Sequence, residues 1–69
     1  MRRQKTTPLR AARLRRRLTQ RALAARVGVT ESHYSDLERG ARRPSIAVAL
    51  RLARVLGVRV ERLFGEDAV

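Results

Sequence analysis

The sequence lacks cysteine and carries a single histidine, and these two scarcities limit the chemistry open to it. Without cysteine, a disulfide framework and a thiolate metal site are both excluded. His33, as the only imidazole, argues against a histidine zinc site within one chain. We therefore expect no metal and no cofactor.

Long apolar runs are also missing. No stretch approaches the roughly 20 apolar residues of a membrane span, and the first residues lack the apolar core of a signal peptide. The 69 residues make one domain with a small core. We expect a cytoplasmic protein without a membrane partner.

Acidic residues are absent from the first 30 positions, where basic residues are abundant. Residues 1–30 hold ten basic side chains, and residues 31–69 hold seven basic and six acidic ones, for a formal net charge of +11. Sixteen of the 17 basic residues are arginine and asparagine is missing, a bias that a GC-rich genome would favour. That bias accounts for arginine over lysine but not for the one-sided distribution. The charge indicates a polyanionic partner, with nucleic acid favoured over a merely solvated surface or an anionic membrane.

The stretch LTQRALAARVGVTESHYSDLERG, residues 18–40, organises the rest of the chain. Thr19 is placed as the N-cap of a helix over 20–27, and Thr30 as the N-cap of a second helix over 31–39. Gly28 and Gly40 supply the left-handed conformation that ends each helix. Only Gly28 and Val29 separate the first helix from the second cap, so the bend is tight. This is helix-turn-helix geometry, in which the second helix is presented to a major groove.

Three further helices are predicted, over 8–17, 46–56 and 60–64. Thr7 followed by Pro8 is a favourable start for the first. One face of that helix carries Leu9, Ala12 and Arg13, with Leu14 and Leu18 turning inward nearby.

The helix over 46–56 has two apolar stripes. The first is predicted to enter the core and consists of Ile46, Leu50, Ala53 and Leu56. The second is formed by Val48, Leu52 and Val55, and Val58 and Val60 follow nearby in sequence. A helix that is apolar on two faces suggests a partner surface. We predict homodimerisation through Val48, Leu52, Val55, Val58 and Val60, the alternative being a wide core face.

The ordered pattern LTQ..LA..VGVT...YS.LERG..RPS.......A..LGV....LF resembles the Cro/phage-repressor class of helix-turn-helix domains, the XRE family. The resemblance covers residues 9–64. It implies an all-α, compact five-helix, lambda-repressor-like domain whose helix-turn-helix is formed by helices 2 and 3. We assign residues 1–6 to a basic flexible arm, 7–64 to the domain with its motif at 20–39, and 65–69 to an acidic tail.

The resemblance also implies roles for single residues. Base-edge readers would be Glu31, Ser32 and Asp36, and His33 could donate to a phosphate or to guanine. Phosphate contact or positioning of the helix on DNA is expected of Gln20, Arg21, Thr30, Ser35, Arg39, Arg42 and Arg43. Blander alternatives are dipole complementation for Glu31, ordinary surface for His33 and a solvated loop for the arginines of 42–43.

Three further positions carry structural expectations. The resemblance pairs Arg13 with Glu38, a contact that would tie the first helix to the end of the third. Tyr34 stands where the family usually has an aliphatic residue, so we expect a packed ring with its hydroxyl at the rim. Arg17 stands where the family usually has glycine. Either Arg17 adopts a left-handed conformation or the helix ends differently.

Together these features predict a sequence-specific, double-stranded DNA-binding transcriptional regulator of the small repressor or controller type. A dimer would read a pseudo-palindrome with half-sites about one helical turn apart. We expect a cytoplasmic, nucleoid-associated protein with no small-molecule ligand. An antitoxin that also binds a protein and a non-specific nucleic-acid binder remain alternatives. An enzyme is disfavoured, because the sequence shows no paired carboxylates on an apolar cleft, no Ser–His constellation and no phosphate-cradling glycine loop.

Overall fold

The computed structural model describes residues 6–65, which fold into five α-helices without a strand. They are α1 (Pro8–Arg15), α2 (Gln20–Val27), α3 (Glu31–Arg39), α4 (Ile46–Leu56) and α5 (Val60–Phe64). The predicted all-α, five-helix architecture is confirmed. Apart from residues 6 and 65, the predicted basic arm and acidic tail lie outside the described residues. None of these five helices has the length and apolarity needed to cross a membrane.

Side-chain caps fix where four of the helices begin. The hydroxyl oxygens of Thr7, Thr19, Thr30 and Ser45 each accept a hydrogen bond from the backbone N–H three residues later, at 3.0–3.2 Å. Between α2 and α3, Gly28 adopts a left-handed conformation with φ +79°. The N–H of Val29 then donates to the carbonyl of Ala24 at 3.0 Å. These contacts produce the two-residue bend that the sequence predicts.

The exit from α1 resolves the ambiguity at Arg17. The helix ends at Arg15, two residues earlier than predicted, and Arg17 is left-handed with φ +57°. Leu18 N–H then donates to the Arg13 carbonyl at 3.2 Å, which closes the turn. A non-glycine residue in this conformation costs about 1–2 kcal/mol. The turn that glycine would make more easily is therefore made by arginine.

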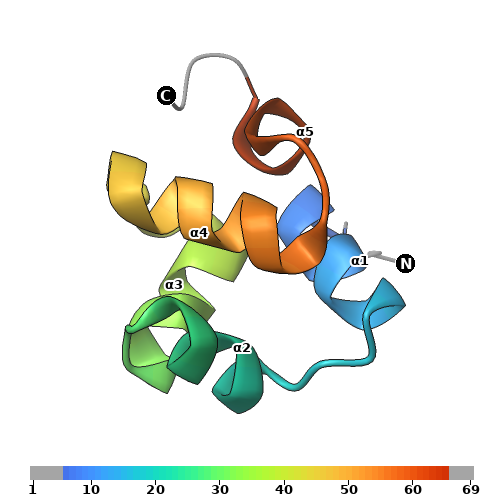
Figure 1. The fold of residues 1–69 in the computed structure, drawn as a ribbon. Coiled ribbons are helices and arrows are strands. Elements are labelled where there is room, and N and C mark those ends of the chain that lie inside the picture. Colours follow the sequence, from blue (N-terminus) through green and yellow to red (C-terminus); the bar gives the residue numbers. More distant parts are fainter. Residues whose placement is uncertain (1–5, 66–69) are drawn as a thin grey trace, which may run out of the picture.

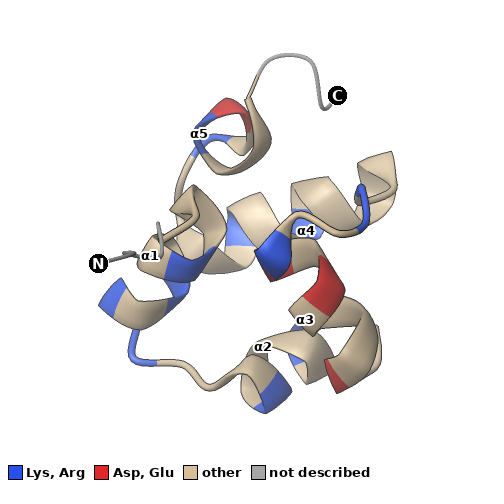
Figure 2. Cartoon of the chain, turned by 180° about the vertical axis from the view of Figure 1, so that it is seen from behind, with Lys and Arg blue, Asp and Glu red and all other residues tan. Residues whose placement is uncertain are grey.

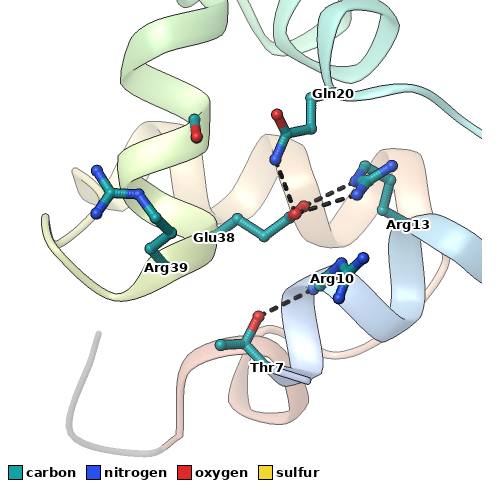
Figure 3. Close-up of a pocket in the computed structure, with 7 residues that line it drawn as sticks. Thr7, Arg10, Arg13, Gln20, Glu38 and Arg39 are labelled. Atoms are coloured by element: carbon teal, nitrogen blue, oxygen red, sulfur yellow. Dashed lines mark hydrogen bonds and ion pairs between the residues drawn. The ribbon is translucent and has the colours of Figure 1, made fainter. Parts of the chain in front are cut away.

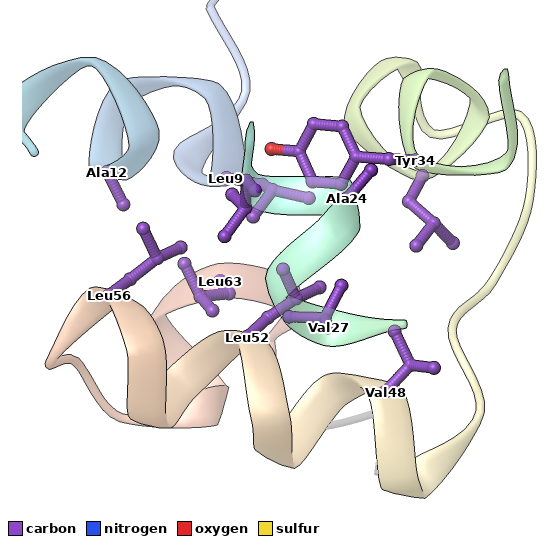
Figure 4. Close-up of a cluster of buried hydrophobic side chains, with 11 residues drawn as sticks. Leu9, Ala12, Ala24, Val27, Tyr34, Val48, Leu52, Leu56 and Leu63 are labelled. Atoms are coloured by element: carbon purple, nitrogen blue, oxygen red, sulfur yellow. The ribbon is translucent and has the colours of Figure 1, made fainter. Parts of the chain in front are cut away.

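The core lies where all five helices meet (Figures 1 and 4). In Figure 1, α4 crosses the centre of the view, with α5 above it and α2 and α3 below. α2 packs on α3 and α4, and α5 packs on α1 and α4. The buried apolar side chains are Leu9, Ala12, Leu23, Ala24, Val27, Tyr34, Leu37, Val48, Ala49, Leu52, Leu56 and Leu63. Leu14, predicted to turn inward, is instead exposed.

The structure overturns part of the prediction for the two stripes of α4, although Leu56 is buried as predicted. Val48 and Leu52, assigned to a dimer interface, are buried in the chain's own core, whereas Ile46 and Leu50, assigned to the core, are 61% and 48% exposed. Val55, Val58 and Val60 are half-buried. Nine of the eleven α4 residues are apolar, so periodicity alone does not distinguish the two faces. Packing against α2 and α5 makes the choice, and it turns the stripe through Leu52 and Leu56 inward.

Candidate nucleic-acid interface

The outward face of α3 is polar along its whole length. Glu31, Ser32 and Arg39 are exposed, and the side chains between them, His33, Ser35 and Asp36, are half-buried. The opposite face is formed by Tyr34, Leu37 and Glu38, all buried. The structure therefore brings the predicted base-reading residues together on one accessible face of one helix. Thr30 caps this helix through its hydroxyl oxygen, which accepts one hydrogen bond, and its O–H can still donate to a ligand.

A buried polar network fixes α3 to the rest of the domain. The Glu38 carboxylate accepts hydrogen bonds from Arg13 Nε at 2.7 Å and Arg13 Nη2 at 3.1 Å, which confirms the predicted pair. Gln20 Nε2 donates to the same carboxylate at 2.9 Å, and the Tyr34 hydroxyl donates at 2.6 Å. Figure 3 shows the Glu38 carboxylate pointing toward Arg13 and Gln20, while Arg39 points away from it.

This network corrects one expectation and gives Gln20 a contact within the protein. The Tyr34 hydroxyl does not lie at the rim: the residue is fully buried, and Glu38 supplies the acceptor that its hydroxyl requires. Gln20, expected to position the helix on DNA, connects the start of α2 to α3 through its bond to Glu38. Arg13 Nη1 also donates to the Leu18 carbonyl at 2.8 Å, so one guanidinium joins α1, the turn after it and α3.

The network holds its groups in fixed charge states. Burial alone would raise the pKa of Glu38, but hydrogen bonds from Arg13, Tyr34 and Gln20 outweigh it and lower that pKa. The hydrogen bond to Glu38 raises the pKa of Arg13. Burial, followed by the bond to Glu38, raises the pKa of Tyr34. Near neutral pH the cluster is therefore an ion pair with a neutral phenol, and it does not titrate.

A polar hollow of about 700 Å³ opens between the start of α1, the start of α2 and the end of α3 (Figure 3). It is lined by Thr7, Arg10, Arg13, Gln20, Ser35, Glu38 and Arg39. Arg13 and Glu38 form its floor through their ion pair, which leaves Arg10 and Arg39 as exposed cations beside it. Arg10 is not among the site residues that the sequence predicts. Its position three residues before Arg13 places it on the same face of α1, and that spacing was the available signal.

The predicted reader Asp36 is engaged by arginines. Its carboxylate forms an ion pair with Arg39, one turn further along α3, and a second with Arg42 Nε at 3.9 Å. Arg42 and Arg43 lie exposed in the loop between α3 and α4, as the sequence predicts, and Arg21 is exposed on the first turn of α2. The contact with Arg39 joins residues three apart on one helix, a spacing that can be read from the sequence, whereas the contact with Arg42 depends on how the loop folds back.

Charge is divided unevenly among the helices (Figure 2). α1, α2 and α4 carry basic residues and no acid, whereas acids occur on α3 and α5. Within residues 6–65, no cluster of three histidine or carboxylate side chains offers a metal site. The surface around α3 therefore presents mixed polar groups flanked by arginines. This arrangement suits a polyanion that also offers hydrogen-bond donors and acceptors, as nucleic acid does at its base edges.

Comparison with known proteins agrees with this geometry. The family described as Helix-turn-helix matches residues 9–63. The chain is 33% identical over 61 residues to the immunity repressor protein of Bacillus phage phi105, covering 88% of this chain and 42% of the repressor. The chain spans less than half the length of the first curated relatives it matches.

Two solved structures share the fold. The restriction-modification controller protein C.AhdI of Aeromonas hydrophila superposes with a TM-score of 0.74 at 35% identity, covering 83% of this chain and 86% of the controller. The DNA-binding domain of the P22 c2 repressor superposes with a TM-score of 0.77 at 29% identity, covering 90% of this chain and 82% of that domain. The chain belongs to the Cro/phage-repressor (XRE-type) family of helix-turn-helix domains.

Proposed function

We propose that this protein is a sequence-specific, double-stranded DNA-binding transcriptional regulator that acts in the cytoplasm and catalyses no reaction. The observation that carries the proposal is the polar outward face of α3, held at a fixed angle by the Glu38 network. The relatives support it, because their names describe an immunity repressor, a controller protein and a DNA-binding domain.

In this mechanism α3 enters the major groove and the surrounding groups grip the backbone. Glu31, Ser32 and His33 are accessible near the N-terminal end of α3, where recognition helices contact base edges. A carboxylate in that position accepts a hydrogen bond from cytosine N4 and is repelled by acceptor edges. Sites that place a cytosine opposite Glu31 are therefore favoured.

Phosphate contacts would fix the register of α3. The hollow beside Arg10 and Arg39 lies at the start of α2, whose free N–H groups and positive dipole end suit an anion. Arg21, Arg42 and Arg43 are exposed and extend this basic border. These groups carry no sequence information themselves, but they determine which bases α3 can reach.

We further propose that the protein binds DNA as a homodimer on a pseudo-palindromic site. Because Val48 and Leu52 are buried, the surface that supports this proposal is the exposed apolar pair Ile46 and Leu50 on α4. Replacing both with serine should lower self-association in sedimentation without loss of helicity. Leu14→Ser is the matched control, since Leu14 is an equally exposed leucine on α1. Equal effects of both changes would remove support for the α4 surface.

The direct test is selection of binding sites from a random duplex library, followed by titration of the selected site and a shuffled copy near physiological salt. We expect a preference of about a hundredfold or more and a two-fold-symmetric footprint, in line with specific readers. Arg62→Ala, an exposed arginine on α5, should leave the preference unchanged. Equal binding to both duplexes, lost steeply with salt, would show a charge-driven binder instead.

A further inference from the structure

Asp36 lies in the middle of the outward face of α3 and is bracketed by two arginines. Its Oδ1 pairs with Arg39 and its Oδ2 with Arg42, so both carboxylate oxygens have a cationic partner. The arginine side chains are 63% and 55% exposed, against 30% for Asp36. The loop is further tied to this residue because the Ala41 N–H donates to the Asp36 carbonyl at 2.9 Å.

This arrangement places an anion between two exposed cations on the side of α3 that would face DNA. A phosphate that approaches Arg39 or Arg42 competes with a carboxylate that is already in place, and it is itself repelled by that carboxylate. Each phosphate neutralised contributes to affinity through counterion release, whatever the sequence. The carboxylate therefore works against non-specific binding in particular, because non-specific binding has almost no other source of affinity.

A specific DNA site can offer the Asp36 carboxylate a new hydrogen-bond donor in place of the two arginines. If a cytosine lies opposite Asp36, its N4 amino group can donate to the carboxylate while both arginines turn to phosphates. A guanine or thymine at that position presents only acceptor atoms and leaves the released carboxylate without a partner, and an adenine places its N7 acceptor, which repels the carboxylate, beside its N6 donor. Exchange of partners is then favourable on one class of sequence and unfavourable on the rest.

We propose that Asp36 is a specificity-determining residue that acts by charge exchange: it restrains Arg39 and Arg42 on non-cognate DNA and releases them when a cytosine replaces them. This role rests on the DNA-binding function proposed above and refines it. It differs from simple base reading, because most of the discrimination comes from lowering affinity for wrong sequences.

The test compares Asp36→Asn with the wild-type protein on a shuffled duplex and on a selected site. On the shuffled duplex, the variant should bind about three- to tenfold more tightly near 0.1 M salt, with a plot of log K against log salt that is steeper by about one. The ratio of selected to shuffled affinity should fall by roughly tenfold or more. Urea unfolding confirms that both proteins are folded.

Two controls separate restraint by Asp36 from a general change of charge. Glu61→Gln changes the net charge by the same amount as Asp36→Asn and also removes an ion pair with an arginine. This pair, Arg59–Glu61, lies at the start of α5 and not on α3. Glu61→Gln should change affinity for the shuffled duplex by less than twofold. In an Arg39→Ala/Arg42→Ala background, Asp36→Asn should likewise have less than a twofold effect.

The charge-exchange role would be overturned if Asp36→Asn did not raise the affinity for the shuffled duplex, or raised it only as much as Glu61→Gln does. It would also be overturned if the increase in affinity persisted without the two arginines. Affinity for the shuffled duplex tests whether Asp36 restrains the two arginines, and this test needs no known operator. Absence of sequence preference in the wild-type protein would instead refute the specific DNA-binding function, so the two failures are distinguishable.

Discussion

Removal of the Glu38 carboxylate should be among the most damaging single changes to this domain. Glu38 is 5% exposed and accepts four hydrogen bonds from three side chains. Glu38→Ala leaves the Arg13 guanidinium, 8% exposed, as a buried charge without its anion, and breaking a buried pair in this way costs about 3–5 kcal/mol. A domain of this size has a free energy of unfolding of roughly 3–10 kcal/mol. We expect loss of half or more of the stability.

The loss of stability in Glu38→Ala should depend on the Arg13 guanidinium remaining buried without its anion. Arg13→Met combined with Glu38→Leu removes both charges, so the double variant should lose about 2 kcal/mol less than the sum of the single changes. It should not regain full stability, because the Leu18 carbonyl and the Tyr34 hydroxyl lose their partners.

The assay is urea unfolding followed by far-ultraviolet circular dichroism, with the slope m compared among variants to confirm a common unfolded state. Glu61→Ala is the control, since its ion pair with Arg59 is exposed and worth no more than about 0.5 kcal/mol. If Glu38→Ala cost less than about 1 kcal/mol, or if the two single losses simply added, the network would not be the element that fixes α3.

Three further outcomes follow from the same contacts. Because the pKa of Glu38 is lowered in the folded state, its contribution to the free energy of unfolding is complete above its ordinary pKa of 4.5 and should be lost as pH falls below that value. Because the pKa of Tyr34 is raised, the folded state should lose stability as pH rises above the ordinary pKa of 10.0. Urea midpoints measured across pH test both expectations. Gly57→Ala should lower the free energy of unfolding by about 1–2 kcal/mol, because φ is +70° there and the new Cβ would overlap the Arg16 guanidinium; a neutral result in urea unfolding would contradict this. Arg10→Ala should weaken binding to all duplexes alike and flatten the salt slope by about one, whereas a loss confined to one sequence would refute its phosphate role.

Much of the fold could be predicted because local signals and packing agree. The bounds of α2, α3 and α5 follow from capping threonines, glycine stops and short apolar patterns. The family pattern identified the Arg13–Glu38 pair, which local reasoning alone would have left as a polar residue on a core face. The helix-turn-helix, and with it the accessible face of α3, can therefore be predicted from the sequence.

The failures occur where several arrangements satisfy the same local rules. α4 is apolar on nearly every side, so only contact with α2 and α5 shows that Leu52 is inside and Leu50 outside. The position of the Tyr34 hydroxyl depends on an acceptor one helical turn away that is itself buried by α1. The pairing of Asp36 with Arg42 depends on the path of a loop, which residue spacing does not encode.

Two arginines that bind the carbonyl groups at helix ends also affect the order in which the domain can fold during synthesis. Arg16 Nε donates to the Leu56 carbonyl at 3.2 Å, 40 residues ahead in the chain, and Arg51 Nη1 donates to the Val27 carbonyl at 3.3 Å, 24 residues behind. α4 is thus joined to α2 and to the turn after α1, although α3, the proposed DNA-reading helix, precedes it in the chain. During synthesis, α3 leaves the ribosome before α4, which packs on α2, the helix that in turn packs on α3. We therefore expect DNA-binding activity to appear abruptly, only after Leu56 has emerged, and not in proportion to the length of chain made.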